Sequence, residues 1–247
     1  MHLDSGLGPT VSRGGYRPRP FVTTLRRRLS LTDRYSRLAP LSGLAFFVLF
    51  ILALLVLGGS TPDSDASPAK VVHFYTVHRG TQQAAALVLA LACVFLLWFV
   101  TVLREELRER GSERLATATL AGGIVMSTGF LVMAAAHFGL ADTAHKLQPA
   151  AAQALNAFDG GTFLVSFAGT FFVAVSLTVA VFRLGLLPRT FGYISALFAV
   201  AMLTPIGWIA WLLMSLWIAA AGVVLSLRRT RAATAAAGPN EPAAAVA

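Results

Sequence analysis

The 247-residue chain is 56% hydrophobic and 13% charged, and its formal net charge is +9. Soluble domains carry about 25% charged residues, whereas the charges here occupy short segments between apolar runs long enough to cross a bilayer, roughly 17–25 residues each. The composition therefore excludes a large soluble domain and predicts an all-α, polytopic bundle of helices in the cell membrane. The single cysteine, Cys93, excludes an intramolecular disulfide and a paired-cysteine metal or redox site.

Residues 1–39 are an arginine-rich tail that we expect to lie in the cytosol. The tail holds eight arginines between Arg13 and Arg37, and such a segment cannot bury a core, so it is predicted to be disordered. Either it acts only as a topological signal or it contacts anionic lipid, which basic residues attract beside a membrane helix. The arginines expected to make that contact are Arg26, Arg27, Arg28, Arg34 and Arg37. The alanine-rich residues 231–247 are predicted to be a second disordered tail.

Six membrane spans are predicted between residues 40 and 230. They are Leu41–Gly59, Ala84–Leu103, Leu115–Phe138, Gly161–Phe182, Thr190–Thr204 and Ile206–Leu227. The fifth is short and is separated from the sixth only by a break around Pro205, so the alternative is a re-entrant segment there. Lysine and arginine concentrate in cytoplasmic loops, and placing both termini inside puts 17 of the 20 basic residues in the cytosol. This asymmetry favours six full spans with cytoplasmic termini.

The stretch VVHFYTVHRG precedes the second span. Ser67 and Pro68 are typical of a helix start, with serine as N-cap and proline at the first helical position. We therefore predict an outer helix at about residues 68–79. Its simplest interpretation is an amphipathic helix in the membrane interface, with Phe74 and Tyr75 in the head-group region.

The charged stretch REELRERGSER follows the second span. Glu106 and Arg110 are spaced i,i+4, as in an ion pair on a solvated helix. Gly111 predicts the end of that helix, and Ser112 begins the next. We expect the second span to extend one or two turns into the cytosol as a solvated, charged helix end.

Ionisable residues collect on the predicted outer side of the membrane. Such groups at a membrane boundary are functional candidates, and the candidate catalytic residues are His78, Arg79, His137 and Asp159. A catalytic zinc needs three His or carboxylate ligands and an open position, which makes His78, His137 and Asp159 the candidate metal ligands. The alternative roles for Asp159 are a salt bridge with Arg79 or a charge at a helix N-terminus.

Several short motifs resemble those of uncharacterised six-helix integral membrane proteins of high-GC Gram-positive bacteria. They are PLSG at the first span, the outer stretch PDSDASPAKVVHFYTVHRG, WFVTVLREELR at the end of the second span and GLLPRTFGYI before the fifth. The outer pattern DAS…V…Y…HR of that family corresponds here to Asp65-Ala66-Ser67, Val72, Tyr75, His78 and Arg79. The resemblance covers roughly residues 40–230 and implies the same fold. That family has no established activity, so the resemblance implies none.

No Asp, Glu, Lys, Arg or His lies near the centre of any predicted span. Proton relays and ion-coupled carriers usually place such groups at the midplane, so an ion-driven transporter is disfavoured. The leading hypothesis is a non-enzymatic module that binds membrane lipid, an apolar ligand or a membrane partner, including a second copy of the chain, and that uses no cofactor and no nucleic acid. The alternatives are an outer-face metal-dependent hydrolase, a haem-binding protein and a transporter.

Overall fold

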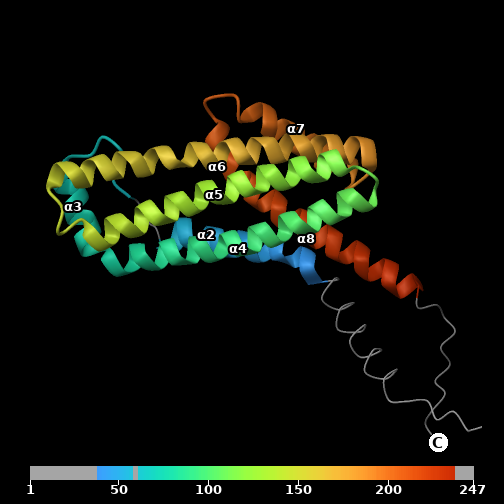
Figure 1. The fold of residues 1–247 in the computed structure, drawn as a ribbon, viewed down its shortest axis with the longest axis horizontal. Coiled ribbons are helices and arrows are strands. Elements are labelled where there is room, and N and C mark those ends of the chain that lie inside the picture. Colours follow the sequence, from blue (N-terminus) through green and yellow to red (C-terminus); the bar gives the residue numbers. More distant parts are fainter. Residues whose placement is uncertain (1–37, 58–60, 237–247) are drawn as a thin grey trace, which may run out of the picture. The chain divides into compact units, whose positions relative to one another are not determined.

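The computed structural model describes residues 38–57 and 61–236, which form helices and no strand. The helices are α2 (Ser42–Ile51), α3 (Pro68–Val77), α4 (Arg79–Glu109), α5 (Glu113–Thr143), α6 (Pro149–Leu184), α7 (Arg189–Ala201) and α8 (Gly207–Ala236) (Figure 1). A short 3₁₀ turn, η1 (Ala39–Leu41), precedes α2, and a π-helical turn, η2 (Leu52–Leu57), follows it. The all-α prediction is thereby confirmed. The expected lipid contacts of the arginine tail lie outside the described residues.

Four helices are long and apolar enough to cross a membrane: α4, α5, α6 and residues Gly207–Ala232 of α8. The predicted second, third and fourth spans lie within α4, α5 and α6, and the predicted sixth begins one residue before α8. The 36 residues of α6 measure about 54 Å at 1.5 Å per residue, against about 30 Å for a hydrocarbon core. Helix α6 therefore extends well past the length that a membrane requires.

The predicted first and fifth spans correspond to shorter helices. The first apolar stretch is helical over Ala39–Leu55. Helix α7 has 13 residues, about 20 Å, which is less than the hydrocarbon thickness. The chain then turns at residues 202–206 and returns as α8, which packs against α7. Helix α8 continues to Ala236, beyond the predicted end of the sixth span at Leu227.

Helices α4, α5 and α6 run side by side along the bundle (Figure 1), and α2 packs against α4 and α8. The contact between α5 and α6 is close because glycines face it. A Cβ atom on Gly129 would lie 2.1 Å from the backbone nitrogen of Ser166, and one on Gly169 would lie 2.2 Å from that of Met126. The small residues of the predicted third and fourth spans thus allow the backbones themselves to touch.

The bundle has two ends, which we call the α3 end and the arginine end. The α3 end contains α3 and the α5–α6 connection, and the arginine end contains the α4–α5 and α6–α7 connections and the last turns of α8 (Figure 1). At the arginine end, Gly111 separates α4 from α5 with a positive φ of 81°, as its sequence context predicts.

Helix α3 forms where the sequence predicts it, with Pro68 as its first residue. Its environment differs from the expectation, because Val71 and Tyr75 are 0% exposed and pack in a second small core with Leu140 and Ala152. The cause is the length of α5 and α6, which extend past their predicted spans and offer an apolar surface. Tyr75 is therefore buried in protein rather than placed among lipid head groups.

Candidate functional site

A hydrogen-bonded polar cluster joins three helices near the α3 end. His137 on α5 contacts Asp159 on α6 through Nδ1 and Oδ2, 3.2 Å apart, and its Nε2 contacts Oε1 of Gln82 on α4. The side chains of His137 and Asp159 are only 14% and 13% exposed. Asp159 lies well inside α6, which begins at Pro149, so it is neither a charge at a helix N-terminus nor a partner of Arg79. Its partner is His137.

Tyr75 covers this cluster from α3. Its ring meets the His137 ring edge to face, with centroids 5.6 Å apart. Burial, and after it the charge of Asp159, raises the pKa of the Tyr75 phenol above its ordinary value, so the phenol keeps its proton at neutral pH. The Tyr75 hydroxyl and Asp159 Oδ1 are both buried and have no hydrogen-bond partner among the residues that the structure describes.

A pocket of about 230 Å³ opens beside His137 and Asp159; we call it the His137 pocket. Most of its wall is apolar and comes from η2, α4, α5 and α6, with the side chains of Ala53, Leu54, Ala86, Leu89, Met133 and Phe163 among those that line it. The exposed residues Thr61 and Gly160 also line it, so the pocket reaches the protein surface. The wider π-helical turn of η2 provides two of the apolar residues, and such turns occur often at functional sites.

The polar and apolar parts of the wall lie at different depths. His137 and Asp159 fall within two residues of the ends of the predicted third and fourth spans. Leu89 and Met133 lie further into α4 and α5, at the level of the apolar spans. A molecule in this pocket would meet hydrogen-bonding groups at one level and, further along α4 and α5, an apolar surface.

His78, the third expected metal ligand, is not part of the cluster. It is exposed, its Nδ1 lies 3.0 Å from the carbonyl oxygen of Phe74, and its ring stacks on the Phe74 ring. Within residues 38–57 and 61–236, no group of three or more His, Cys, Asp or Glu side chains is placed to hold a metal ion. The structure brings together two of the three expected ligands, His137 and Asp159.

Arg79, the remaining candidate, belongs to a separate ion pair at the surface. Its Nη2 donates a hydrogen bond to Asp142 Oδ1 at 2.5 Å, and Gln83 Nε2 lies 3.3 Å from the same oxygen. The Arg79 guanidinium holds the pKa of Asp142 below its usual range. The side chains of Arg79 and Asp142 are 45% and 40% exposed, and Arg79 is bound to Asp142 rather than to the buried Asp159.

Gln82 is the site residue that the sequence analysis did not identify. It precedes the predicted second span by two residues, and it is 2% exposed. The available signal is its spacing, because Ala86 and Leu89 follow it at i+4 and i+7 on the same helix face and line the pocket. A glutamine on the buried face of a membrane helix is a marker of a polar contact inside the bundle.

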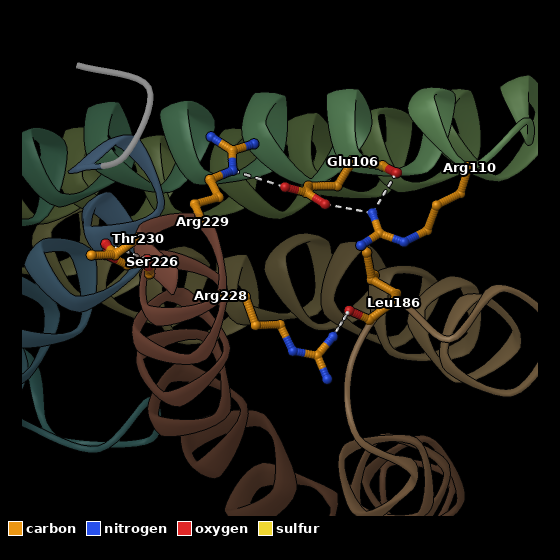
Figure 2. Close-up of polar contacts among 7 residues, drawn as sticks. All are labelled: Glu106, Arg110, Leu186, Ser226, Arg228, Arg229 and Thr230. Carbon is orange, nitrogen blue, oxygen red and sulfur yellow. Dashed lines mark hydrogen bonds and ion pairs between the residues drawn. The ribbon is translucent and has the colours of Figure 1, made fainter. Parts of the chain in front are cut away.

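A second buried polar group lies at the arginine end (Figure 2). Glu106, which is 7% exposed, accepts a hydrogen bond from Arg229 Nε at 2.8 Å and another from Arg110. Burial alone would raise the pKa of Glu106, but these two arginines outweigh it and the pKa lies below its usual value. Arg228 Nη1 donates to the Leu186 carbonyl oxygen at 3.0 Å. Glu106 is thus not the solvated residue that the sequence predicts, but a link between α4 and α8.

Four helices of membrane-spanning length define the class, a helical membrane protein, and three of them, α4, α5 and α6, line a largely apolar pocket together with η2. Comparisons with protein-family models, with curated proteins and with solved structures found no match to the chain. The site and its geometry are therefore the features of the chain that bear on its function.

Proposed function

We propose that the chain is a six-span protein of the plasma membrane, with both termini in the cytosol, that binds an amphiphilic, lipid-like ligand in the His137 pocket. The asymmetry of lysine and arginine supports the orientation. The hydrogen bond between Arg228 and Leu186 also supports it, because it joins the end of α8 to the α6–α7 connection. Helices α7 and α8 then form a hairpin that begins and ends in the cytosol, whether its turn crosses the bilayer fully or stays within it.

The single cysteine makes this topology testable. In a Cys93→Ser background, Thr204→Cys places a thiol in the exposed turn between α7 and α8, and Ser112→Cys places one at the α4–α5 connection. In intact cells, a membrane-impermeant maleimide should label position 204, and position 112 should react only after permeabilisation. Labelling of position 112 in intact cells, or the reverse pattern, would contradict the orientation. Failure to label position 204 under either condition would favour a re-entrant turn.

The binding proposal rests on the arrangement of the pocket wall, in which polar residues lie at one level and apolar residues at another. Ligand sites are usually concave and mostly apolar, with a few polar groups that fix orientation. In the His137 pocket those polar groups lie near the membrane boundary and the apolar wall lies deeper. A membrane amphiphile has the same order of parts, with its polar end at the interface and its chain in the hydrocarbon.

The volume sets the size of the ligand. A cavity of 230 Å³ is below the usual range of about 300–1,000 Å³ for drug-sized ligands and holds about eight groups of the size of water, at about 30 Å³ each. A single chain of about eight carbons, or the end of a longer chain, fits this space better than two acyl chains do.

Methyl NMR of methionine can test the proposal, because Met133 lines the pocket and Met214 is a fully buried control elsewhere in the core. Protein labelled with ¹³C at the methionine methyl groups, in lipid nanodiscs, would be titrated with 1-octanol. The proposal predicts a saturable shift at Met133 with little change at Met214. A linear, non-saturating drift of both signals would contradict it.

Two adjacent glycines provide matched variants. Gly160 lines the pocket, and a Cβ there would meet only Ser64 at 3.4 Å, whereas one on Gly161 would meet nothing within 4 Å. Both substitutions are therefore tolerated sterically at the backbone. Gly160→Phe should abolish the Met133 shift by filling the pocket, and Gly161→Phe should preserve it. Equal effects of the two variants would show that the Met133 shift does not report binding in the His137 pocket.

A hydrolase acting at the outer face is the second proposal, and the His137–Asp159 hydrogen bond favours it because such a pair orients a general base. The contact between His137 Nε2 and Gln82 weighs against it, since that nitrogen would have to face the substrate. Release of p-nitrophenol from p-nitrophenyl octanoate by the wild type, and not by His137→Gln, would support the hydrolase. Equal background release would contradict it.

A further inference from the structure

Asp159 Oδ1 is the one atom of the His137–Asp159 pair whose hydrogen bonding is incomplete. The other carboxylate oxygen, Oδ2, faces His137 Nδ1, while Oδ1 is buried without a partner among the described residues. An unpaired oxygen of a buried carboxylate is costly, because hydrogen bonds to water are lost and not replaced. Asp159 lines the pocket with the rest of its side chain, which is 13% exposed, so a bound molecule reaches Oδ1 when the carboxylate turns about its Cβ–Cγ bond.

The protonation state of His137 does not change the finding that Asp159 Oδ1 has no hydrogen-bond donor among the described residues. As placed, both ring nitrogens face oxygen atoms, so a cationic imidazole donates from both. If it is neutral with its proton on Nδ1, the Gln82 amide turns its NH₂ group toward Nε2. A neutral imidazole with its proton on Nε2 would set two acceptors, Nδ1 and the ionised Oδ2, against each other, which disfavours it. In the first two states His137 donates a hydrogen bond to Asp159 Oδ2. Asp159 Oδ1 stays an acceptor that needs a donor in either case.

The surrounding residues do not supply that donor. None of the described residues lining the pocket is lysine or arginine. The basic residue expected to reach Asp159, Arg79, is bound to Asp142. The Tyr75 hydroxyl is near enough for the charge of Asp159 to raise its pKa, but it makes no hydrogen bond to Asp159 and does not line the pocket.

We infer that the polar end of the ligand is a hydrogen-bond donor, a hydroxyl or an ammonium group, which binds the incompletely bonded Asp159 carboxylate while the chain lies along the apolar wall. The inference rests on the proposed function and specifies its ligand class. It excludes fatty acids and other carboxylate or phosphate amphiphiles, because an anionic end would meet the Asp159 carboxylate in a wall without lysine or arginine, and His137 already faces Asp159 Oδ2.

Four amphiphiles of matched chain length test this inference in the Met133 NMR titration: 1-octanol, octylamine, methyl octyl ether and octanoate. The ether has the chain and an acceptor but no donor. Since a hydrogen bond to a charged group is among the stronger ones, the alcohol and the amine should bind about tenfold or more tighter than the ether. Octanoate should bind weakest of the four.

The outcomes separate the two proposals. Equal affinities for all four compounds would overturn the inference and leave the pocket as a binding site, as expected if a water molecule satisfies Oδ1. Tightest binding by octanoate would also overturn it. No saturable shift with any compound would contradict the proposed function itself. Selective binding of the amine alone, or of the alcohol alone, would support the inference and identify which donor the site prefers.

The variant Asp159→Asn tests whether this residue causes the preference for hydrogen-bond donors over the ether. The amide keeps the size and one acceptor but loses the charge, so the preference for octylamine over the ether should fall toward unity, with a smaller change for 1-octanol. An unchanged amine preference would overturn the role of Asp159. If this variant does not fold, the wild-type panel still decides the inference, and Gly160→Phe shows whether the selective binding occurs in the pocket.

Discussion

Each end of the bundle buries a carboxylate, and the two carboxylates differ in how completely their oxygens are hydrogen-bonded. At the arginine end, both oxygens of Glu106 receive hydrogen bonds from guanidinium groups, one of Arg110 directly after the end of α4 and one of Arg229 on α8. At the α3 end, Asp159 has one bonded oxygen and one unpaired oxygen beside a pocket. A carboxylate with both oxygens hydrogen-bonded links helices and stabilises the bundle. A carboxylate with one unpaired oxygen, on a side chain that lines a cavity, can accept a further hydrogen bond from a ligand.

The largest effect is expected at Glu106. Glu106→Gln leaves Arg110 and Arg229 without their counter-charge, and breaking a buried pair in this way costs about 3 kcal/mol. For a chain of this length, that corresponds to a melting temperature lower by roughly 6–12 °C in detergent. Glu105→Gln, an exposed neighbour on the same helix, is the matched control and should leave melting unchanged. Equal melting of the two variants would mean that the Glu106 pair does not fasten α4 to α8.

Acidification gives a second, smaller test of the same end. Because the pKa of Glu106 is lowered in the folded protein, its contribution to stability is complete above the unfolded pKa of about 4.3 and is lost as pH falls through the folded pKa. Melting curves between pH 7 and pH 3 should show the gap between wild type and Glu106→Gln closing below about pH 4. A gap that stays constant over this range would show that the charge of Glu106 is not the cause.

Asp159→Asn should have little effect on stability, in contrast with Glu106→Gln. The carboxylate is only partly bonded, so a neutral amide of equal size keeps the His137 contact and removes a poorly compensated charge. We expect the free energy of unfolding to change by less than about 1 kcal/mol. A loss of unfolding free energy as large as that of Glu106→Gln would show that Asp159 stabilises the helix packing. The two ends of the bundle would then not differ in the way described.

The smallest effect is expected for the surface pair at the α3 end. The side chains of Arg79 and Asp142 are both partly exposed, so solvent and salt screen their attraction. Arg79→Gln should leave the melting temperature unchanged in 0.5 M salt, and melting with and without salt should be compared with the wild type. A large drop that persists in high salt would place Arg79 in the buried cluster.

Much of the fold follows from local patterns in the chain. The long apolar runs predict α4, α5, α6 and most of α8, Gly111 predicts the break between α4 and α5, and Ser67-Pro68 predicts the start of α3. These features depend on residues near one another in sequence. The lengths of α2 and α7 were less predictable, because hydropathy does not report where a helix ends inside an apolar segment.

The candidate site could be predicted only in part. His137 and Asp159 were identified from their position at the ends of predicted spans, and the structure places them together. Which partner each takes depends on how the helices are rotated about their axes, and that rotation is set by tertiary packing such as the glycine contact between α5 and α6. The same limit explains why Gln82 and the link from Glu106 to Arg229 were missed.

The central claim is that the α3 end holds a ligand, and native mass spectrometry tests it most directly. The protein would be released gently from its own membrane, together with Gly160→Phe and Gly161→Phe. We expect one small bound amphiphile on the wild type and on Gly161→Phe, and none on Gly160→Phe. Identical spectra for all three proteins, with or without added mass, would contradict a ligand in the His137 pocket.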